Sequence, residues 1–250
     1  NDTGVFFFFM SHLMANTTLT QLQQSPGGEG MDLKVSTFSL GKIWFRVLNP
    51  EDGEGEVMLK KPGSDEAQAT TGVEYRLVPD TRDLLGARML LTMNPEDGEK
   101  LKNGEAMTPE VAQAAIKKAM TESPKFNSTF NEIPVFLIAQ MRMQKAPEED
   151  EEEGESVTLM PMYFSLQNMV NTWQQFMAQA PPDMQGVEPA INLMALHDLV
   201  EMMQTESPID FRNVVLVPST LPNSTASGDG LQPAAADPMS QMGGSTLGDL

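Results

Sequence analysis

The two histidines, His12 and His197, are the residues best suited to acid–base chemistry, because an imidazole changes its charge near neutral pH. His197 is followed directly by Asp198. A hydrolase triad needs a serine, a histidine and a carboxylate in mutual contact, but adjacent residues on a helix project in different directions. The sequence therefore does not favour a catalytic triad. It predicts that His197 lies on a helix surface or is partly buried.

Other reactive sites find little support in the residue types present. The chain has no cysteine, which excludes disulfides, thiolate metal sites and cysteine nucleophiles. Two histidines argue against a multi-histidine metal centre. The segment Gly27-Gly28-Glu29-Gly30 lacks the Lys and the Ser or Thr of a phosphate-binding loop and is interpreted as a plain connection. We expect no enzymatic activity, no metal and no cofactor.

The charge balance restricts the class of partner. The 250 residues include 16 Lys and Arg against 35 Asp and Glu, which gives a formal net charge of −19. Binding to nucleic acid through phosphate contacts needs a positive surface and is excluded. The longest apolar run covers only residues 5–10, whereas a bilayer-spanning helix needs about twenty residues. The composition predicts an acidic, soluble protein that does not span a membrane.

The order strand, helix, strand, helix, strand is predicted twice along the chain. The first copy comprises residues 5–9, 11–22, 34–38, 39–44 and a strand that ends in Leu-Val-Pro at Pro79. The second copy comprises 161–164, 165–177, 190–194, 195–200 and a strand that ends in Leu-Val-Pro at Pro218. Aligning Phe9 with Phe164 sets an offset of 155. One such unit buries too little surface alone, so the copies should share a core and be related by a pseudo-two-fold axis.

These elements predict a mixed α/β (α+β) fold with helices packed on a mixed sheet. Residues 1–218 form one two-lobed domain, with lobe one at 1–93, a connecting helical segment at 94–131 and lobe two at 132–218. Helices are expected at 81–93 and 108–120, and a hairpin joins 133–143 to 157–164 across the acidic run 148–155. The first copy lacks this hairpin arm, which predicts a chain shortened at its N-terminus. Residues 219–250 form an extended polar tail.

Several short segments resemble one protein family. They are Glu-Tyr-Arg-Leu-Val-Pro-Asp at 74–80, Ile-Pro-Val-Phe at 133–136, Pro-Met-Tyr-Phe at 161–164 and Val-Val-Leu-Val-Pro at 214–218. They are similar to segments of the twenty-two-kilodalton Tic proteins of the translocon at the inner chloroplast envelope membrane, over residues 4–219. The resemblance implies a non-enzymatic plastid protein with two similar α/β halves and apolar grooves, which acts as a chaperone-like adaptor or scaffold in protein transport. The acidic run, the enlarged loop at 49–72 and the tail depart from the family pattern.

Protein partners are expected at methionines, aromatic residues and the acidic run. The 20 methionines form either an adaptable binding surface or filling for the core. Trp44 and Trp173 anchor either the core or a groove between the lobes. The acidic run is either a solvated loop or a docking element for a basic surface. The candidate partner-binding residues are Trp44, Met162, Met169, Trp173, Phe176, Met202, Met203, Glu149, Glu151 and Glu152.

Two functions fit these expectations. The first is that of the family, a chaperone-like adaptor or scaffold for translocating polypeptides. The alternative is a structural linker bound peripherally to a large photosynthetic membrane assembly, a photosystem with its antenna proteins. In both cases the partners are other proteins, belonging to a membrane-embedded plastid complex. A polar tail that becomes ordered would then lie on such a partner, because binding offsets the entropy lost on ordering.

Overall fold

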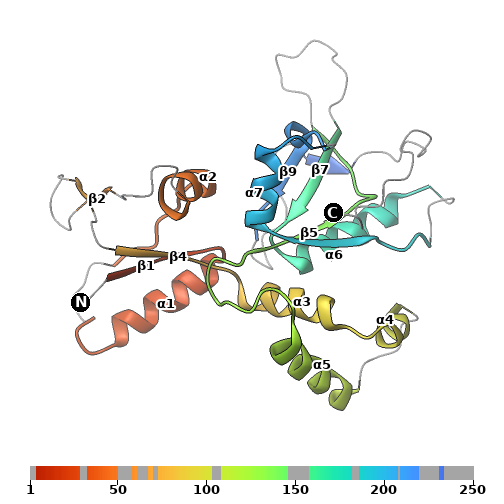
Figure 1. Ribbon diagram of the computed structural model, residues 1–250, viewed down its shortest axis with the longest axis horizontal. Helices are drawn as coiled ribbons and strands as arrows, with labels where there is room; N and C mark the ends of the chain where they lie inside the picture. Colours follow the sequence, from red (N-terminus) through yellow and green to blue (C-terminus); the bar gives the residue numbers. More distant parts are fainter. Residues whose placement is uncertain are drawn as a thin grey trace, which may run out of the picture.

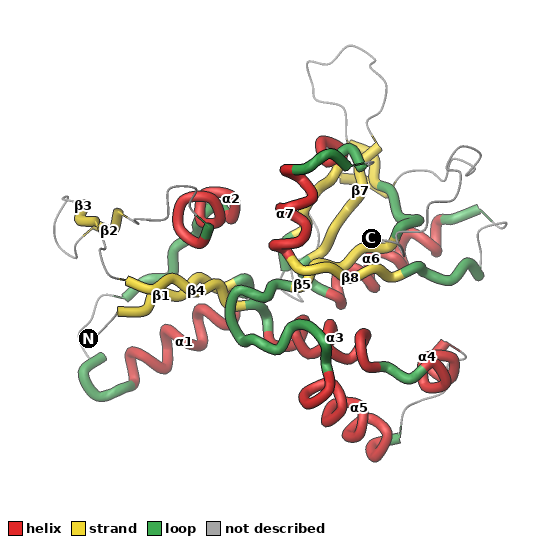
Figure 2. The backbone as a smooth tube through the Cα atoms, viewed as in Figure 1, coloured by secondary structure: helices red, strands yellow, loops and turns green. Residues whose placement is uncertain are grey.

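The fold is mixed α/β, as predicted, in a computed structural model (Figure 1, Figure 2). The structure describes residues 4–28, 33–49, 58–60, 67–69, 73–102, 108–145, 158–181, 186–207, 209–219 and 231–233. The acidic run at 148–155, with Glu149, Glu151 and Glu152, lies outside these ranges. So does most of the predicted tail.

The N-terminal part of the chain, residues 4–80, is built on two parallel strands. β1 (Gly4–Phe9) pairs with β4 (Val73–Val78), in a register that begins at Gly4↔Val73 and ends at Phe9↔Val78. α1 (His12–Gln24) follows β1 and lies along the strand pair on the side away from α2 (Leu40–Ile43) (Figure 1). α2 continues into a short π-helix, Trp44–Leu48. A separate antiparallel hairpin joins β2 (Met58–Lys60) to β3 (Ala67–Ala69).

The strand predicted at 34–38 is not formed. Residues 33–39 have no helix or strand structure and are mostly exposed. A β-strand depends on hydrogen bonds to a neighbouring strand, and no described strand pairs with this segment. The prediction of a strand at 34–38 is therefore wrong.

The C-terminal part, residues 133–219, forms a larger sheet around β7 (Thr158–Tyr163). β5 (Pro134–Ile138) and β6 (Met143–Lys145) pair with β7 in antiparallel fashion, and β9 (Val214–Val217) pairs with it in parallel. β8 (Ile191–Ala195) extends the sheet beyond β5, and β10 (Leu231–Pro233) extends it beyond β6. The predicted hairpin is confirmed, although the single strand expected at 133–143 is divided into β5 and β6.

Two helices accompany this sheet. α6 (Leu166–Gln179) follows β7, and its Ser165 hydroxyl accepts the Asn168 N–H. α7 (Leu196–Gln204) follows β8 directly. A 3-10 helix, Phe211–Asn213, leads into β9. None of the helices in the described ranges combines the length and the apolar composition needed to cross a bilayer.

Three helices connect the two parts: α3 (Thr81–Thr92), α4 (Pro95–Lys102) and α5 (Pro109–Glu122). The Asp80 carboxylate accepts the Arg82 N–H at the start of α3, and the Thr108 hydroxyl accepts the Val111 N–H at the start of α5. Both helices begin where the sequence predicted. The three helices lie below the strands in the view of Figure 1.

Alternate side chains on the strands divide the interior into two cores, because successive residues point to opposite faces of a sheet. Val135 and Leu137 of β5 enter the first core, while Phe136 and Ile138 enter the second. The first core joins both parts of the chain. Its buried members are Phe8, Ile43, Trp44, Leu77, Ile133, Val135, Leu137, Met162, Phe164, Leu196 and Leu199. The second core lies between the C-terminal sheet, α3 and α6.

The two copies share a local arrangement, but in a register one residue away from the predicted one. The Met10 N–H donates to the Val78 oxygen over 2.9 Å, as the Phe164 N–H donates to the Val217 oxygen over 3.1 Å. In this hydrogen bond Met10, and not Phe9, corresponds to Phe164, which is an offset of 154 rather than the predicted 155. In both copies a serine follows and a helix begins. The pseudo-two-fold axis itself remains a prediction.

Candidate functional site

Most of the predicted partner-binding residues that the structure describes are buried. They are Trp44, Met162, Met169, Trp173 and Phe176, which belong to the two cores. Met202 is half-buried against the first core, and Met203 is exposed. The five buried side chains match the alternative of core packing, and they offer no free surface in this conformation. A role in partner binding remains a prediction for them, as it does for Glu149, Glu151 and Glu152, which lie outside the described residues.

The histidine–aspartate pair is in contact, contrary to the expectation that its members point apart. The His197 Nε2 atom lies 2.8 Å from Asp198 Oδ1, and Lys125 Nζ lies 3.3 Å from Asp198 Oδ2. His197 is exposed, as expected for a helix surface. Within the described ranges no serine hydroxyl hydrogen-bonds to His197 and no group of three or more His, Asp or Glu is arranged to hold a metal ion. Asp198 thus contacts both His197 and Lys125 at the surface.

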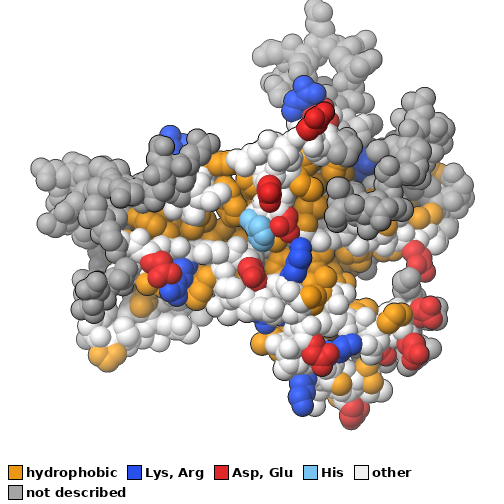
Figure 3. Space-filling model, in the orientation of Figure 1, with side chains coloured by type: hydrophobic (Ala, Val, Ile, Leu, Met, Phe, Trp, Pro, Cys, Tyr) orange, Lys and Arg blue, Asp and Glu red, His pale blue; other side chains and the backbone are white. Residues whose placement is uncertain are grey.

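An aromatic surface on the first-core side of β1 is the most distinctive feature available to a partner. It consists of Phe6, Phe8, Phe38 and Tyr75, and the sequence analysis did not single out any of these four residues. The Phe8 ring lies 5.7 Å from the Phe38 ring, edge to face, and 5.0 Å from the Phe6 ring. Phe8 is buried, whereas Phe38 is 51% exposed. Figure 3 shows hydrophobic side chains gathered along β1 and β4 and continuing toward α7.

Two further exposed apolar side chains lie close to Phe38 in the sequence. Val35 precedes Phe38 in the irregular segment 33–39, and Phe45 follows it in the π-helix. Both are large apolar residues that remain exposed. The only signal in the sequence is an apolar pair in a Ser/Thr-rich segment, which also suits a half-buried strand. The sequence alone could not distinguish a half-buried strand from an exposed binding segment.

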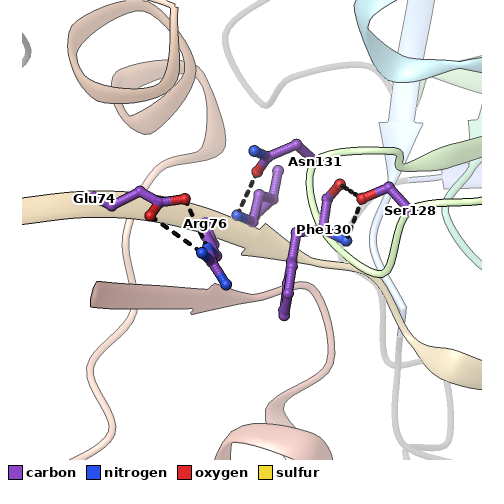
Figure 4. Close-up of polar contacts among 6 residues, drawn as sticks. Glu74, Arg76, Ser128, Phe130 and Asn131 are labelled. Carbon is purple, nitrogen blue, oxygen red and sulfur yellow. Dashed lines mark hydrogen bonds and ion pairs between the residues drawn. The ribbon is translucent and has the colours of Figure 1, made fainter. Parts of the chain in front are cut away.

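The opposite face of β4 carries a charged and aromatic cluster (Figure 4). The Arg76 guanidinium lies 4.8 Å from the centroid of the Phe130 ring, a cation–π distance. Arg76 Nε and Nη2 donate to the two carboxylate oxygens of Glu74 over 2.8 and 3.1 Å. The hydrogen bond from Arg76 lowers the pKa of Glu74. Because the pair is exposed to solvent, it contributes little stability and mainly orients the guanidinium.

Asn131 fastens the loop that follows α5 to the free edge of β4 (Figure 4). Its N–H donates to the Leu77 oxygen over 2.7 Å, and its side-chain oxygen accepts the Leu77 N–H over 2.8 Å. Asn131 has a φ of 64°, in the left-handed region that asparagine tolerates better than most residues. It thus takes the place of a strand beside β4. The Ser128 hydroxyl donates to the Phe130 oxygen over 2.8 Å and braces the same loop.

Two carboxylates at the start of α3 connect three helices. Asp83 Oδ1 accepts the N–H of Leu166, the first residue of α6, over 2.9 Å. Burial raises the pKa of Asp83 to about 6. Burial also acts to raise the pKa of Asp80, but hydrogen bonds from Arg82 and from the Ser11 side chain outweigh it and lower the pKa. Ser11 immediately precedes α1, so this joint positions α1 and α6 around α3.

A buried arginine holds the turn between α5 and the C-terminal sheet. Arg88 Nε donates to the Phe126 oxygen over 2.6 Å, and Nη2 donates to the Asn127 oxygen over 3.4 Å. Arg88 Nη1 lies 3.1 Å from the Met120 sulfur. Phe126 is itself buried and has a φ of 62°. These contacts stabilise the scaffold where the chain passes from α5 to β5.

Comparisons with known proteins found similar chains among solved structures. No protein-family model matches the chain, and no curated protein matches it. The chain is similar to the structure of Tic22 from Plasmodium falciparum, with a TM-score of 0.47 and 16% identity over 86% of this chain and 77% of that one. It is also similar to Anabaena Tic22 (protein transport), with a TM-score of 0.46 and 15% identity over 86% of this chain and 75% of that one. Both structures carry the name of the family that the sequence resembles.

Proposed function

We propose that this chain is a non-catalytic plastid protein that binds other polypeptides, as a chaperone-like adaptor or scaffold in protein transport. The observation that carries the proposal is the aromatic surface, with Phe38 half exposed on a buried Phe8. The sequence resemblance to the Tic family supports the plastid location and the role in transport. The protein is expected to be peripheral to the membrane rather than inserted in it.

The physical basis is the cost of leaving large aromatic side chains in water. Contiguous apolar patches on soluble proteins mark sites of interaction, and aromatic residues are enriched at protein interfaces. Here the exposed ring of Phe38 adjoins the first core. The segment 33–38 that carries it forms neither helix nor strand. Such a segment can adjust to apolar side chains of differing shape, as a chaperone-like surface requires.

A binding measurement with a permanently unfolded polypeptide tests the proposal. Labelled α-lactalbumin that has been reduced and carboxymethylated is titrated with the protein, and the anisotropy is recorded. We expect saturable binding that is at least about tenfold weaker for Phe38→Ser, as for loss of an interface anchor. The matched control is Ile116→Ser. The Ile116 side chain is apolar and 42% exposed on α5, remote in the sequence from Phe38. Absence of binding, or equal loss in both variants, contradicts the proposal.

The finer role is decided by the proteins that accompany the chain in plastids. The protein is purified from solubilised plastid membranes and its companions are identified by mass spectrometry. The adaptor role predicts components of a protein translocon in the purified fraction. Enrichment of chlorophyll-binding proteins, without translocon components, would replace the adaptor role by that of a photosystem linker.

A further inference from the structure

The edge of β1 that faces away from β4 presents unpaired backbone groups. Backbone N–H and C=O groups of successive strand residues point alternately to the two neighbouring positions. The Met10 N–H bonds to β4, so Val5, Phe7 and Phe9 direct their N–H and C=O groups away from β4. Among the described residues, none forms a backbone hydrogen bond to these groups. Within the part of the chain that the structure describes, β1 is therefore an edge strand with a row of unpaired donors and acceptors.

The C-terminal part of the same chain shows which kind of strand fits such an edge. With the offset of 154, Val5 and Phe9 correspond to Leu159 and Tyr163 of β7. Leu159 pairs with Met143 of β6, and Tyr163 pairs with Phe136 of β5, both in antiparallel orientation. In β7 this edge is filled by antiparallel strands, whereas in β1 it is open. An antiparallel strand with apolar side chains is thus the matching occupant.

The β1 edge lacks the charges and prolines that commonly discourage strand pairing. Natural edge strands are blunted by charges, prolines or bulges, and Gly4–Phe9 contains neither a charge nor a proline. Residues 4–28 include no Asp, Glu, Lys or Arg, although 20% of the whole chain is charged. At that frequency a segment of this length would carry about five charges.

The charge distribution indicates that the partner is a second copy. The chain carries a net charge of −19, so two copies repel one another over most of their surfaces. The charge-free segment 4–28 is a surface through which they can meet without opposing carboxylates. α1 within it also exposes Leu13 and Leu22, which can pack once the strands are paired.

We propose that β1 pairs antiparallel with β1 of a second copy and forms a two-fold symmetric dimer. Phe7 lies on the dyad opposite the partner's Phe7, and Val5 lies opposite the partner's Phe9. Each of these facing pairs exchanges two main-chain hydrogen bonds. Val5 and Phe7, which are 38% and 40% exposed, then form one continuous apolar row. The isolated two-strand sheet becomes a sheet of four strands, which is the more stable size.

The oligomeric state of the intact chain tests the dimer. Sedimentation equilibrium should show a reversible dimer, and Phe7→Pro should raise its dissociation constant at least about tenfold, because each copy loses a central donor. Proline suits this position, since Pro161 occupies the corresponding place in β7. The control is Ile116→Lys, an exposed apolar position on α5, which should leave the dimer unchanged. A monomer at about 100 μM, or a dimer that is insensitive to Phe7→Pro, overturns the proposal.

A cross-linking experiment leaves β1 otherwise intact and locates the interface. Because the chain has no cysteine, Phe7→Cys introduces a single thiol per copy. Facing residues in a hydrogen-bonded antiparallel pair have Cα atoms about 5.5 Å apart, which is within the range of a disulfide. Mild oxidation should give a covalent dimer with Phe7→Cys and not with Leu91→Cys, an exposed control on α3. Equal cross-linking of both variants, or of neither, overturns the pairing of β1 with itself.

Discussion

Asp83 and Leu166 lie 83 residues apart in the sequence, yet the carboxylate of Asp83 accepts the backbone N–H of Leu166 over 2.9 Å. The first turn of α3 therefore fixes the first residue of α6. The cost of this contact is a buried carboxylate, since burial raises the pKa of Asp83 to about 6.

The raised pKa predicts how stability depends on pH at this joint. In the unfolded chain an aspartate titrates near 3.9, so the folded protein binds the Asp83 proton more tightly. This contribution is fully present below about pH 4 and is lost as the pH rises through about 6. We expect Asp83→Asn, which keeps an acceptor for Leu166, to raise the free energy of unfolding at pH 7 by about 1–3 kcal/mol. At pH 4 the variant should equal the parent protein.

Urea unfolding between pH 4 and pH 8 measures this difference. The control is Asp210→Asn, an exposed carboxylate whose pKa is lowered by its hydrogen bond from Arg212. It should not reproduce the gain at pH 7. A loss of stability in Asp83→Asn that is the same at pH 4 and pH 7 would contradict the assignment of the penalty to the charge.

The buried Arg88 should be among the most sensitive polar residues. Arg88→Met keeps most of the side-chain volume but leaves the Phe126 and Asn127 oxygens without their donors. We expect a loss of about 2–4 kcal/mol in the free energy of unfolding, as for a buried hydrogen-bonded charge. Arg212→Met, at a side chain that is 89% exposed, should change stability by less than about 0.5 kcal/mol. Chemical denaturation of both variants provides the comparison.

Asn131 combines a positive φ with a pair of hydrogen bonds to Leu77, and two substitutions separate these roles. Asn131→Ala and Asn131→Gly both remove the acceptor for the Leu77 N–H. Only glycine adopts a φ of 64° without strain. Asn131→Gly should therefore be about 1 kcal/mol more stable than Asn131→Ala, as measured by thermal unfolding. Equal stabilities would show that the backbone at 131 relaxes when the side chain is removed.

Gly86 of α3 lies beside Leu166 at the start of α6. A Cβ atom at this position would lie 2.9 Å from Leu166 Cδ2, at the flexible end of that side chain. Gly86→Ala should be nearly neutral, because a helix-propensity gain of about 1 kcal/mol offsets the shift of Leu166. Gly86→Leu should cost about 1–3 kcal/mol by overpacking. Adding Leu166→Ala to Gly86→Leu should recover part of that loss, and calorimetry of the single and double variants would reveal it.

Local signals in the sequence predicted many of the elements. The start of α5 at Thr108-Pro109 was found because N-terminal proline chemistry acts within one helical turn. The helix expected from residue 81 corresponds to α3, which the Asp80 side chain caps. The hairpin around 134–138 and 158–163 was found from short apolar strands on either side of a polar run. The strand expected at 34–38 failed because strand formation depends on a distant neighbour, which the sequence of the segment does not encode.

The candidate site was harder to predict, since apolar spacing does not distinguish a core from a binding surface. Met169, Trp173 and Phe176 share one helix face, and that face is in the second core. Asp83 and Arg88 resemble exposed helix residues by type. Their spacing around Leu84 and Ala87 places all four on one buried face of α3, and this periodicity was the one available sign of their burial.

The first core has a consequence for synthesis of the chain. Phe8 and Leu77 pack in it with Met162, Phe164 and Leu199. When the first hundred residues have left the ribosome, Met162, Phe164 and Leu199 have not yet been translated. The side chains of Phe8 and Leu77 therefore stay without these neighbours until residue 199 has left the exit tunnel.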